Sequence, residues 1–119
     1  GSDTATPIED YLLEDLSTVR GEATLPPLHF QLYQNFPNPF NSGTTIEFFL
    51  PFSEKVVLTI DDALGRTVCI LQNDELPAGA HALKWDGRDQ AGRDVASGLY
   101  FARLIHGSRT KTIKMVLVR

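Results

Sequence analysis

Residues 44–61 read TTIEFFLPFSEKVVLTID, and this stretch decides the fold. Apolar side chains recur at every second position on either side of Pro51: Ile46, Phe48, Leu50, Val56, Leu58 and Ile60. A period of two is typical of strands with one buried face, and the β-branched and aromatic content also favours strands. The stretch therefore predicts two core-facing strands, at 44–50 and 55–61.

The sequence after residue 30 continues in the same way, with turn signals roughly every ten residues. Five more strands are expected, at 31–34, 66–72, 81–85, 99–106 and 111–118. Gly65 suits the positive backbone angle of a hairpin turn, and Gly107-Ser108 predicts a second tight turn. Because no helix-length crossover separates the strands, their pairing should be antiparallel. Residues 31–119 are thus predicted to form an all-β, antiparallel β-sandwich of about seven strands.

Residues 1–30 are predicted to form an N-terminal arm. Gly1-Ser2 looks like a remnant of cloning, and Thr6-Pro7-Ile8-Glu9 forms a capping box. Apolar residues then follow at helical spacing: Ile8, Tyr11, Leu12, Leu16 and Val19. The pattern predicts a short amphipathic helix over 7–20, followed by an extended linker with Pro26-Pro27. Its apolar stripe needs a partner, which is the sandwich, an upstream domain, or a second copy through self-association.

The charge is unevenly distributed in this chain of 119 residues, whose net charge is −4. Residues 1–30 hold six carboxylates and one arginine, and beyond Asp94 only basic charged side chains follow. A sequence pI of about 5.2 without a concentrated basic patch argues against nucleic-acid binding. No stretch approaches the ~20 apolar residues of a membrane helix, so no membrane insertion is expected. Cys69 has no partner for an internal disulfide and is expected to be buried.

Motifs for catalysis are absent from the sequence, so no enzyme, catalytic residue or cofactor is predicted. The nearest approach to a metal site is the loop 86–94, where Asp86, Asp89 and Asp94 could collect calcium. Its spacing does not fit an EF-hand, and Arg88 and Arg93 would neutralise the carboxylates. Turn chemistry is the favoured interpretation of the loop. Trp85 alternates with Leu83 and is expected to pack in the core.

The segment 32–41 reads LYQNFPNPFN and resembles the opening of the C-terminal sorting domains of type IX (Por) secretion cargo in the Bacteroidetes and related phyla. Its prolines remove backbone donors and favour an extended path. Its asparagines can bond the free backbone groups of that path. Phe36 and Phe40 are expected to anchor it to the core.

Later blocks are similar to the same family in the same order, and the match spans residues 32–119. The residues assigned to family motifs with structural roles are Asn35, Pro37, Asn38, Pro39, Phe40, Asn41, Gly65, Trp85, Asp86, Gly87, Gly98 and Tyr100. Two positions depart from the family pattern. Ser42 replaces a proline, which should loosen the loop, and Asp61 replaces an aromatic, which places a charge at a strand end that must face water.

The resemblance implies a non-catalytic, immunoglobulin-like domain that labels a larger cargo protein for export. Its partners would be the type IX outer-membrane translocon, a sortase-like machinery and the upstream cargo domain. The domain would pass through the periplasm and end at the cell surface or outside the cell. The residues expected to be recognised are those of the final strand: Lys114, Met115, Val116, Leu117, Val118 and Arg119. Lys114 and Arg119 would be exposed, with Met115 and Leu117 holding the strand in the sheet.

Two other functions remain open from the residues. The Trp85-Asp86-Gly87 and Ser97–Tyr100 blocks also resemble the immunoglobulin-like domain of flagellar hook-capping proteins, which would make the chain a scaffold. An adhesive or carbohydrate-binding sandwich is the other alternative. It would need an aromatic platform in which Trp85, Phe49 or Phe101 face solvent together.

Overall fold

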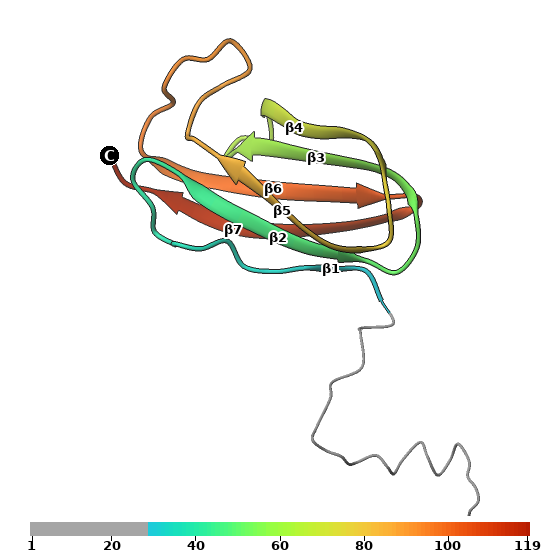
Figure 1. Cartoon of the computed structure of the whole chain (residues 1–119). Coiled ribbons are helices and arrows are strands. Elements are labelled where there is room, and N and C mark those ends of the chain that lie inside the picture. Colours follow the sequence, from blue (N-terminus) through green and yellow to red (C-terminus); the bar gives the residue numbers. More distant parts are fainter. Residues whose placement is uncertain (1–28) are drawn as a thin grey trace, which may run out of the picture.

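The computed structural model describes residues 29–119 and arranges them as two stacked antiparallel sheets (Figure 1). The strands are β1 (Gln31–Leu32), β2 (Thr44–Leu50), β3 (Glu54–Asp62), β4 (Thr67–Leu76), β5 (Gly79–Trp85), β6 (Gly98–His106) and β7 (Arg109–Leu117). One sheet has the order β1-β2-β5 and the other β4-β3-β6-β7. The prediction of an antiparallel, all-β fold with about seven strands is confirmed. The helix predicted over 7–20 and the linker with Pro26-Pro27 lie outside the described residues.

The largest difference from the predicted strand bounds is in β4, which was expected to end at residue 72. It continues to Leu76 because Lys55 pairs with Glu75 and Glu54 pairs with Leu76 across the β3–β4 hairpin. Asn73 and Asp74 are residue types that are depleted in strands, so a prediction from strand propensity ends this strand too early. Pairing with β3 supplies the hydrogen bonds that extend it.

The core lies between the two sheets and contains the alternating residues that predict the fold. Ile46, Phe48 and Leu50 of β2 and Val56, Leu58 and Ile60 of β3 are each 0% exposed. Trp85 is 1% exposed and lies between the rings of Phe40 and Tyr100, with centroids 5.6 and 5.3 Å away. Since Trp85 is buried, it does not share an exposed aromatic platform with Phe49 and Phe101. Cys69 is buried as expected, and burial raises its thiol pKa to about 11.

Two predictions about individual side chains are wrong. Asp61 does not face water, because it is 7% exposed and accepts a hydrogen bond from Arg103 Nε at 3.0 Å. The β3–β6 register places Arg103 opposite Thr59, diagonal to Asp61, where its guanidinium can reach the carboxylate. Phe36 does not anchor the opening segment, because 79% of it is exposed. Neighbouring side chains of an extended chain point opposite ways, so Phe36 faces out where Asn35 is buried.

Candidate functional site

The final strand β7 is bound along its outer edge by the opening segment, residues 34–40. Phe40 N donates to Val116 O at 3.0 Å, and Val118 N donates to Phe40 O at 2.8 Å. The side chain of Asn38 accepts a hydrogen bond from Val116 N at 3.0 Å. Gln34 Nε2 donates to Lys114 O at 2.7 Å. The segment thus covers the strand edge that the family resemblance associates with recognition.

The opening segment is held in shape by one buried side chain and one buried ring. Asn35 is 2% exposed, and its Nδ2 donates to Thr44 Oγ1 at 2.9 Å and to Pro37 O at 3.2 Å. The Thr44 hydroxyl donates to the same carbonyl at 2.8 Å. Phe40 is 3% exposed and packs edge-on against Trp85. These contacts attach the segment to the β1-β2-β5 sheet, and its bonds to β7 attach it to the other sheet.

The six residues predicted for recognition fall into three groups. Met115 and Leu117 are 0% and 1% exposed and belong to the core. Lys114, Val116 and Val118 are exposed or half-buried, with Val118 at 52%. Arg119 is tied down, since its Nε donates to Val95 O at 2.7 Å, its Nη2 to Gly87 O, and its backbone N to Ser97 Oγ. A binding partner could therefore contact chiefly Lys114, Val116 and Val118.

The loop between β5 and β6 is fixed at both ends by aromatic side chains. Trp85 Nε1 donates to Arg88 O at 2.9 Å. Tyr100 OH donates to Ala96 O at 2.7 Å, four residues upstream, as in the tyrosine corner of immunoglobulin-like sandwiches. Burial is the main cause that raises the pKa of this phenol. The tryptophan and tyrosine of the family motifs thus combine core packing with loop attachment.

Two turns at this end of the sandwich share one sequence pattern, Asp-x-x-Gly-Arg, which the sequence reading missed. They are residues 62–66, between β3 and β4, and residues 89–93, within the β5–β6 loop. Gly65 and Gly92 have φ angles of 84° and 82°, a region that favours glycine. The repeated pattern was visible in the sequence, and only its spatial pairing required the structure.

The hydrogen bonds of the two turns also correspond. Asp62 Oδ1 accepts from the backbone N atoms of Leu64 and Arg66, both at 2.9 Å. Asp89 Oδ1 accepts from those of Ala91 and Arg93, at 3.0 and 2.9 Å. In each turn the arginine Nε donates to the other carboxylate oxygen, at 2.9 Å for Arg66 and 3.2 Å for Arg93. These hydrogen bonds lower the pKa of both carboxyls, and the bond from the arginine backbone N–H has the largest effect.

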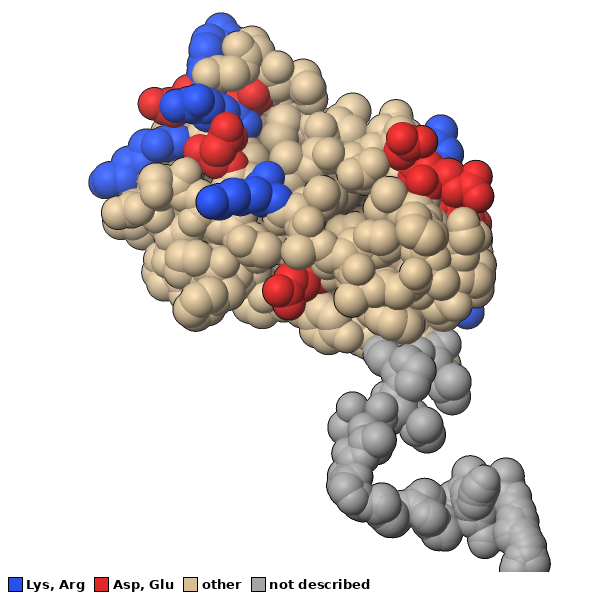
Figure 2. Space-filling view, in the orientation of Figure 1, with Lys and Arg blue, Asp and Glu red and all other residues tan. Residues whose placement is uncertain are grey.

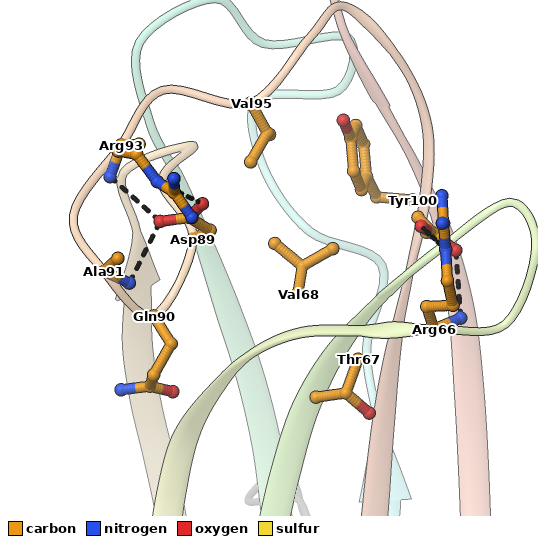
Figure 3. Close-up of a pocket in the computed structure, with 10 residues that line it drawn as sticks. Arg66, Thr67, Val68, Asp89, Gln90, Ala91, Arg93, Val95 and Tyr100 are labelled. Atoms are coloured by element: carbon orange, nitrogen blue, oxygen red, sulfur yellow. Dashed lines mark hydrogen bonds and ion pairs between the residues drawn. The ribbon is translucent and has the colours of Figure 1, made fainter.

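A depression of about 490 Å³ lies between these twin turns, with residues from both turns along its sides (Figure 3). Val68, Val95 and Tyr100 line its middle, and the two Asp–Arg pairs stand on opposite sides. Gln90 joins the loop to β4, because its N donates to Val68 O at 3.0 Å and its Oε1 accepts from Ile70 N at 2.8 Å. Each side of the depression is electrically balanced, so it shows no net preference for an anion or a cation.

The three carboxylates considered as calcium ligands, Asp86, Asp89 and Asp94, do not share a common partner. Asp89 is held within its turn, and Asp94 accepts from Arg88 Nε at 3.2 Å, while Asp86 is exposed. Within residues 29–119, no three His, Cys, Asp or Glu side chains are grouped closely enough to hold a metal ion. The contacts of Asp89 are those of turn chemistry.

Charged side chains gather at the two ends of the sandwich in the view of Figure 2, and the face over β2 and β5 carries few of them. One group covers the β5–β6 loop, where Arg88, Asp89, Arg93 and Asp94 are paired with each other. In the described part of the chain, no helix is long and apolar enough to cross a bilayer. The visible face is thus a largely uncharged surface between two charged ends.

The twin turns should make stability depend on pH. Because the folded-state pKa of Asp62 and of Asp89 is lowered, their stabilising effect is present above the unfolded pKa of about 3.9. It is lost as the pH falls through the lower folded pKa. We expect the melting temperature of the D62N/D89N double variant to fall less steeply than wild type between about pH 5 and pH 2. The same slope in both proteins, measured by circular dichroism, would contradict this assignment, and D74N is a matched surface control.

Comparison with known proteins places this arrangement in a family. A model of the FlgD Ig-like domain matches residues 40–104, which include Trp85, Tyr100 and both twin turns. The chain belongs to the FlgD Ig-like domain family. It is 44% identical over 48 residues to the basal-body rod modification protein FlgD of Salmonella typhimurium, and the same values hold for Salmonella typhi. That alignment covers 40% of this chain and 21% of the relative, so the chain spans about a fifth of the relative's length.

Solved structures that are similar to this chain include two Por proteins and a FlgD. Dimeric latent PorU of Porphyromonas gingivalis has a TM-score of 0.60 at 22% identity, over 79% of this chain and 10% of that one. PorZ, a surface component of the type IX secretion system of the same organism, has a TM-score of 0.52 at 24% identity, over 74% and 11%. FlgD of P. aeruginosa has a TM-score of 0.50 at 25% identity, over 62% and 58%. The Por likenesses show the fold alone, which is immunoglobulin-like.

Proposed function

We propose that this Ig-like domain is a C-terminal sorting signal, which directs a larger cargo protein through the outer membrane by the type IX secretion system. The observation that carries the proposal is the attachment of the QNFPNPF segment, residues 34–40, to the final strand through Asn38, Phe40 and Gln34. The two parts of the sequence that resemble the sorting family most specifically form one continuous surface. In this proposal the export machinery recognises the domain through that surface.

The translocon and its sortase-like machinery would contact exposed side chains on this surface. Lys114 and Val118 project from the strand and its continuation, while Met115 and Leu117 keep the strand in the sheet. Arg119 would act indirectly, by fixing the tail to Gly87 and Val95. In this proposal the domain is not an enzyme and needs no cofactor. It passes through the periplasm and reaches the cell surface or the medium with its cargo.

A test in a type IX host should use surface substitutions, because a chain ended at Ile113 would lack the core residues Met115 and Leu117 and is expected to unfold. We expect a reporter fused to the whole chain to lose at least about tenfold in surface delivery with K114E/V118E, the equivalent of about 1.4 kcal/mol of lost binding. K84E on β5 is the control, since Lys84 is also an exposed strand lysine. Delivery of K114E/V118E at the wild-type level, with normal folding, would refute the proposal.

A second function, that of a scaffold domain in a flagellar protein such as FlgD, is favoured by the family match. That match covers residues 40–104 and so includes only Phe40 of the opening segment and no residue of β7. A scaffold would keep its assembly partner when Lys114 and Val118 are changed, and would not move a reporter to the surface of a type IX host. The reporter experiment therefore separates the two functions.

A further inference from the structure

The outer face of the β4-β3-β6-β7 sheet is unusually apolar. Six apolar side chains lie on it, outside the core: Val57, Ile70, Leu99, Phe101, Ile105 and Val116. The register puts Val57 beside Ile105 and Leu99 beside Val116. The open face of an antiparallel sheet is normally polar, and a contiguous apolar face of this kind marks an interaction site.

Polar groups on the same face also indicate a missing cover. Thr59 is 6% exposed, and its hydroxyl has no hydrogen-bond partner among residues 29–119. A buried hydroxyl without a partner is costly, and a covering segment could supply an acceptor. Arg103 remains 39% exposed while it bonds Asp61, and the exposed Lys114 pairs in register with Phe101. Because Asp61 balances the charge of Arg103, Lys114 is the cationic side chain left beside the apolar rows.

We propose that residues 7–20 of the same chain dock on this face as an amphipathic helix. The apolar stripe of Ile8, Tyr11, Leu12, Leu16 and Val19 would cover the apolar rows. Residues 1–28 carry six carboxylates and a single arginine, so the arm has the opposite charge to Lys114. The arm thus supplies both the apolar surface and the charge that the sheet face requires.

The dimensions agree with one helix on one face. Residues 7–20 as a helix would be about 21 Å long and about 10–12 Å wide. The apolar rows from Leu99 to Ile105 extend for about 20 Å along β6, and four strands span about 14 Å. The helix and the apolar rows therefore have nearly the same length. No second element is needed to fill the space.

The arm reaches this face from its point of attachment. Phe30 is 1% exposed and packs against His106 at 5.3 Å between rings, with Lys111 Nζ 5.7 Å from the Phe30 ring centre. The arm therefore joins the sandwich beside the β6–β7 turn, near His106 and Lys111. Residues 21–28 can extend for about 26–29 Å, several times the ~5 Å spacing between neighbouring strands. Docking within one chain is thus geometrically easy.

Disulfide trapping in the full chain tests the docking. Leu16→Cys is combined with Ile105→Cys, or with Ala82→Cys on the outer face of the other sheet as a matched control. Cys69 can stay, because it is buried and its thiol pKa is about 11. We expect the Ile105→Cys pair to form an intrachain disulfide at least about tenfold faster than the control pair, because docking raises the effective concentration. Equal rates, or mainly interchain dimers at about 10 μM protein, would overturn the proposal, the latter in favour of a second copy.

A second measurement needs no cysteine chemistry. Leu12→Glu should uncover the sheet face and raise the fluorescence of the apolar dye ANS, whereas Leu13→Glu, off the apolar stripe, should not. Equal fluorescence in the two variants would also overturn the docking. Lys114 and Val116 belong to this face and to the proposed recognition surface. Arm and translocon would therefore exclude each other there.

Discussion

Replacing Trp85 with alanine should lower the free energy of unfolding by about 3–5 kcal/mol, the range for removing a large buried aromatic side chain. Trp85 is 1% exposed, contacts the rings of Phe40 and Tyr100, and donates to Arg88 O. The substitution would remove contacts with the opening segment, with β6 and with the β5–β6 loop at once. Since total stabilities of single domains are about 5–15 kcal/mol, much of the fold's stability depends on this residue.

Urea denaturation followed by circular dichroism is the suitable measurement, because Trp85 is the single tryptophan and its fluorescence disappears with it. Phe36→Ala is the control, since Phe36 is 79% exposed and its truncation should change stability by less than about 0.5 kcal/mol. A loss below about 1 kcal/mol in Trp85→Ala would show that the core closes around the gap, contrary to the packing described here.

Replacing Phe40 with alanine should cost a similar amount, about 3–5 kcal/mol, and should also loosen the C-terminal tail. Its ring is 3% exposed, and its backbone N and O bond Val116 and Val118. Losing the ring weakens the anchor that holds those backbone bonds. We expect lower stability by Trp85 fluorescence and faster trypsin cleavage after Lys114 under native conditions.

The double variant Phe40→Ala/Trp85→Ala tests whether the two rings act together. Edge-on aromatic pairs contribute about 0.5–1.5 kcal/mol beyond the area they bury, so the double loss should be smaller than the sum by about that amount. Additive losses would show that the two rings do not stabilise each other. Native-state cleavage after Lys114 that is unchanged in Phe40→Ala would show that the tail is held without this ring.

The strands could be predicted because alternation is a local property of the sequence. Ile46 to Ile60 show it clearly, and their burial follows. The partners of the strands could not be predicted in this way. Only Pro77 and Ala78 separate β4 from β5, which resembles a hairpin, yet the two strands lie in different sheets and β5 pairs with β2. That choice depends on packing between distant residues, which no local pattern contains.

The residues of the candidate site could be predicted from the sequence, but most of the contacts between them could not. The opening segment and the final strand were both singled out, but their direct attachment through Asn38 and Phe40 was not foreseen. Arg119 is exposed as expected, but its guanidinium also donates to Val95 O and Gly87 O in the β5–β6 loop, which was not foreseen. The predictions for Phe36 and Asp61 were wrong because the exposure of each side chain depends on a neighbour. Phe36 faces out because Asn35 is buried, and Asp61 is buried because Arg103 of another strand bonds it.

The bond between Asn38 and Val116 joins positions 78 residues apart. During synthesis the earlier partner leaves the ribosome long before the later one, so the sandwich stays open until nearly all of it has been made. Any chain that stops short leaves the Asn38 side chain and the Phe40 backbone without their partners. Closure of this contact therefore reports that translation has passed residue 118.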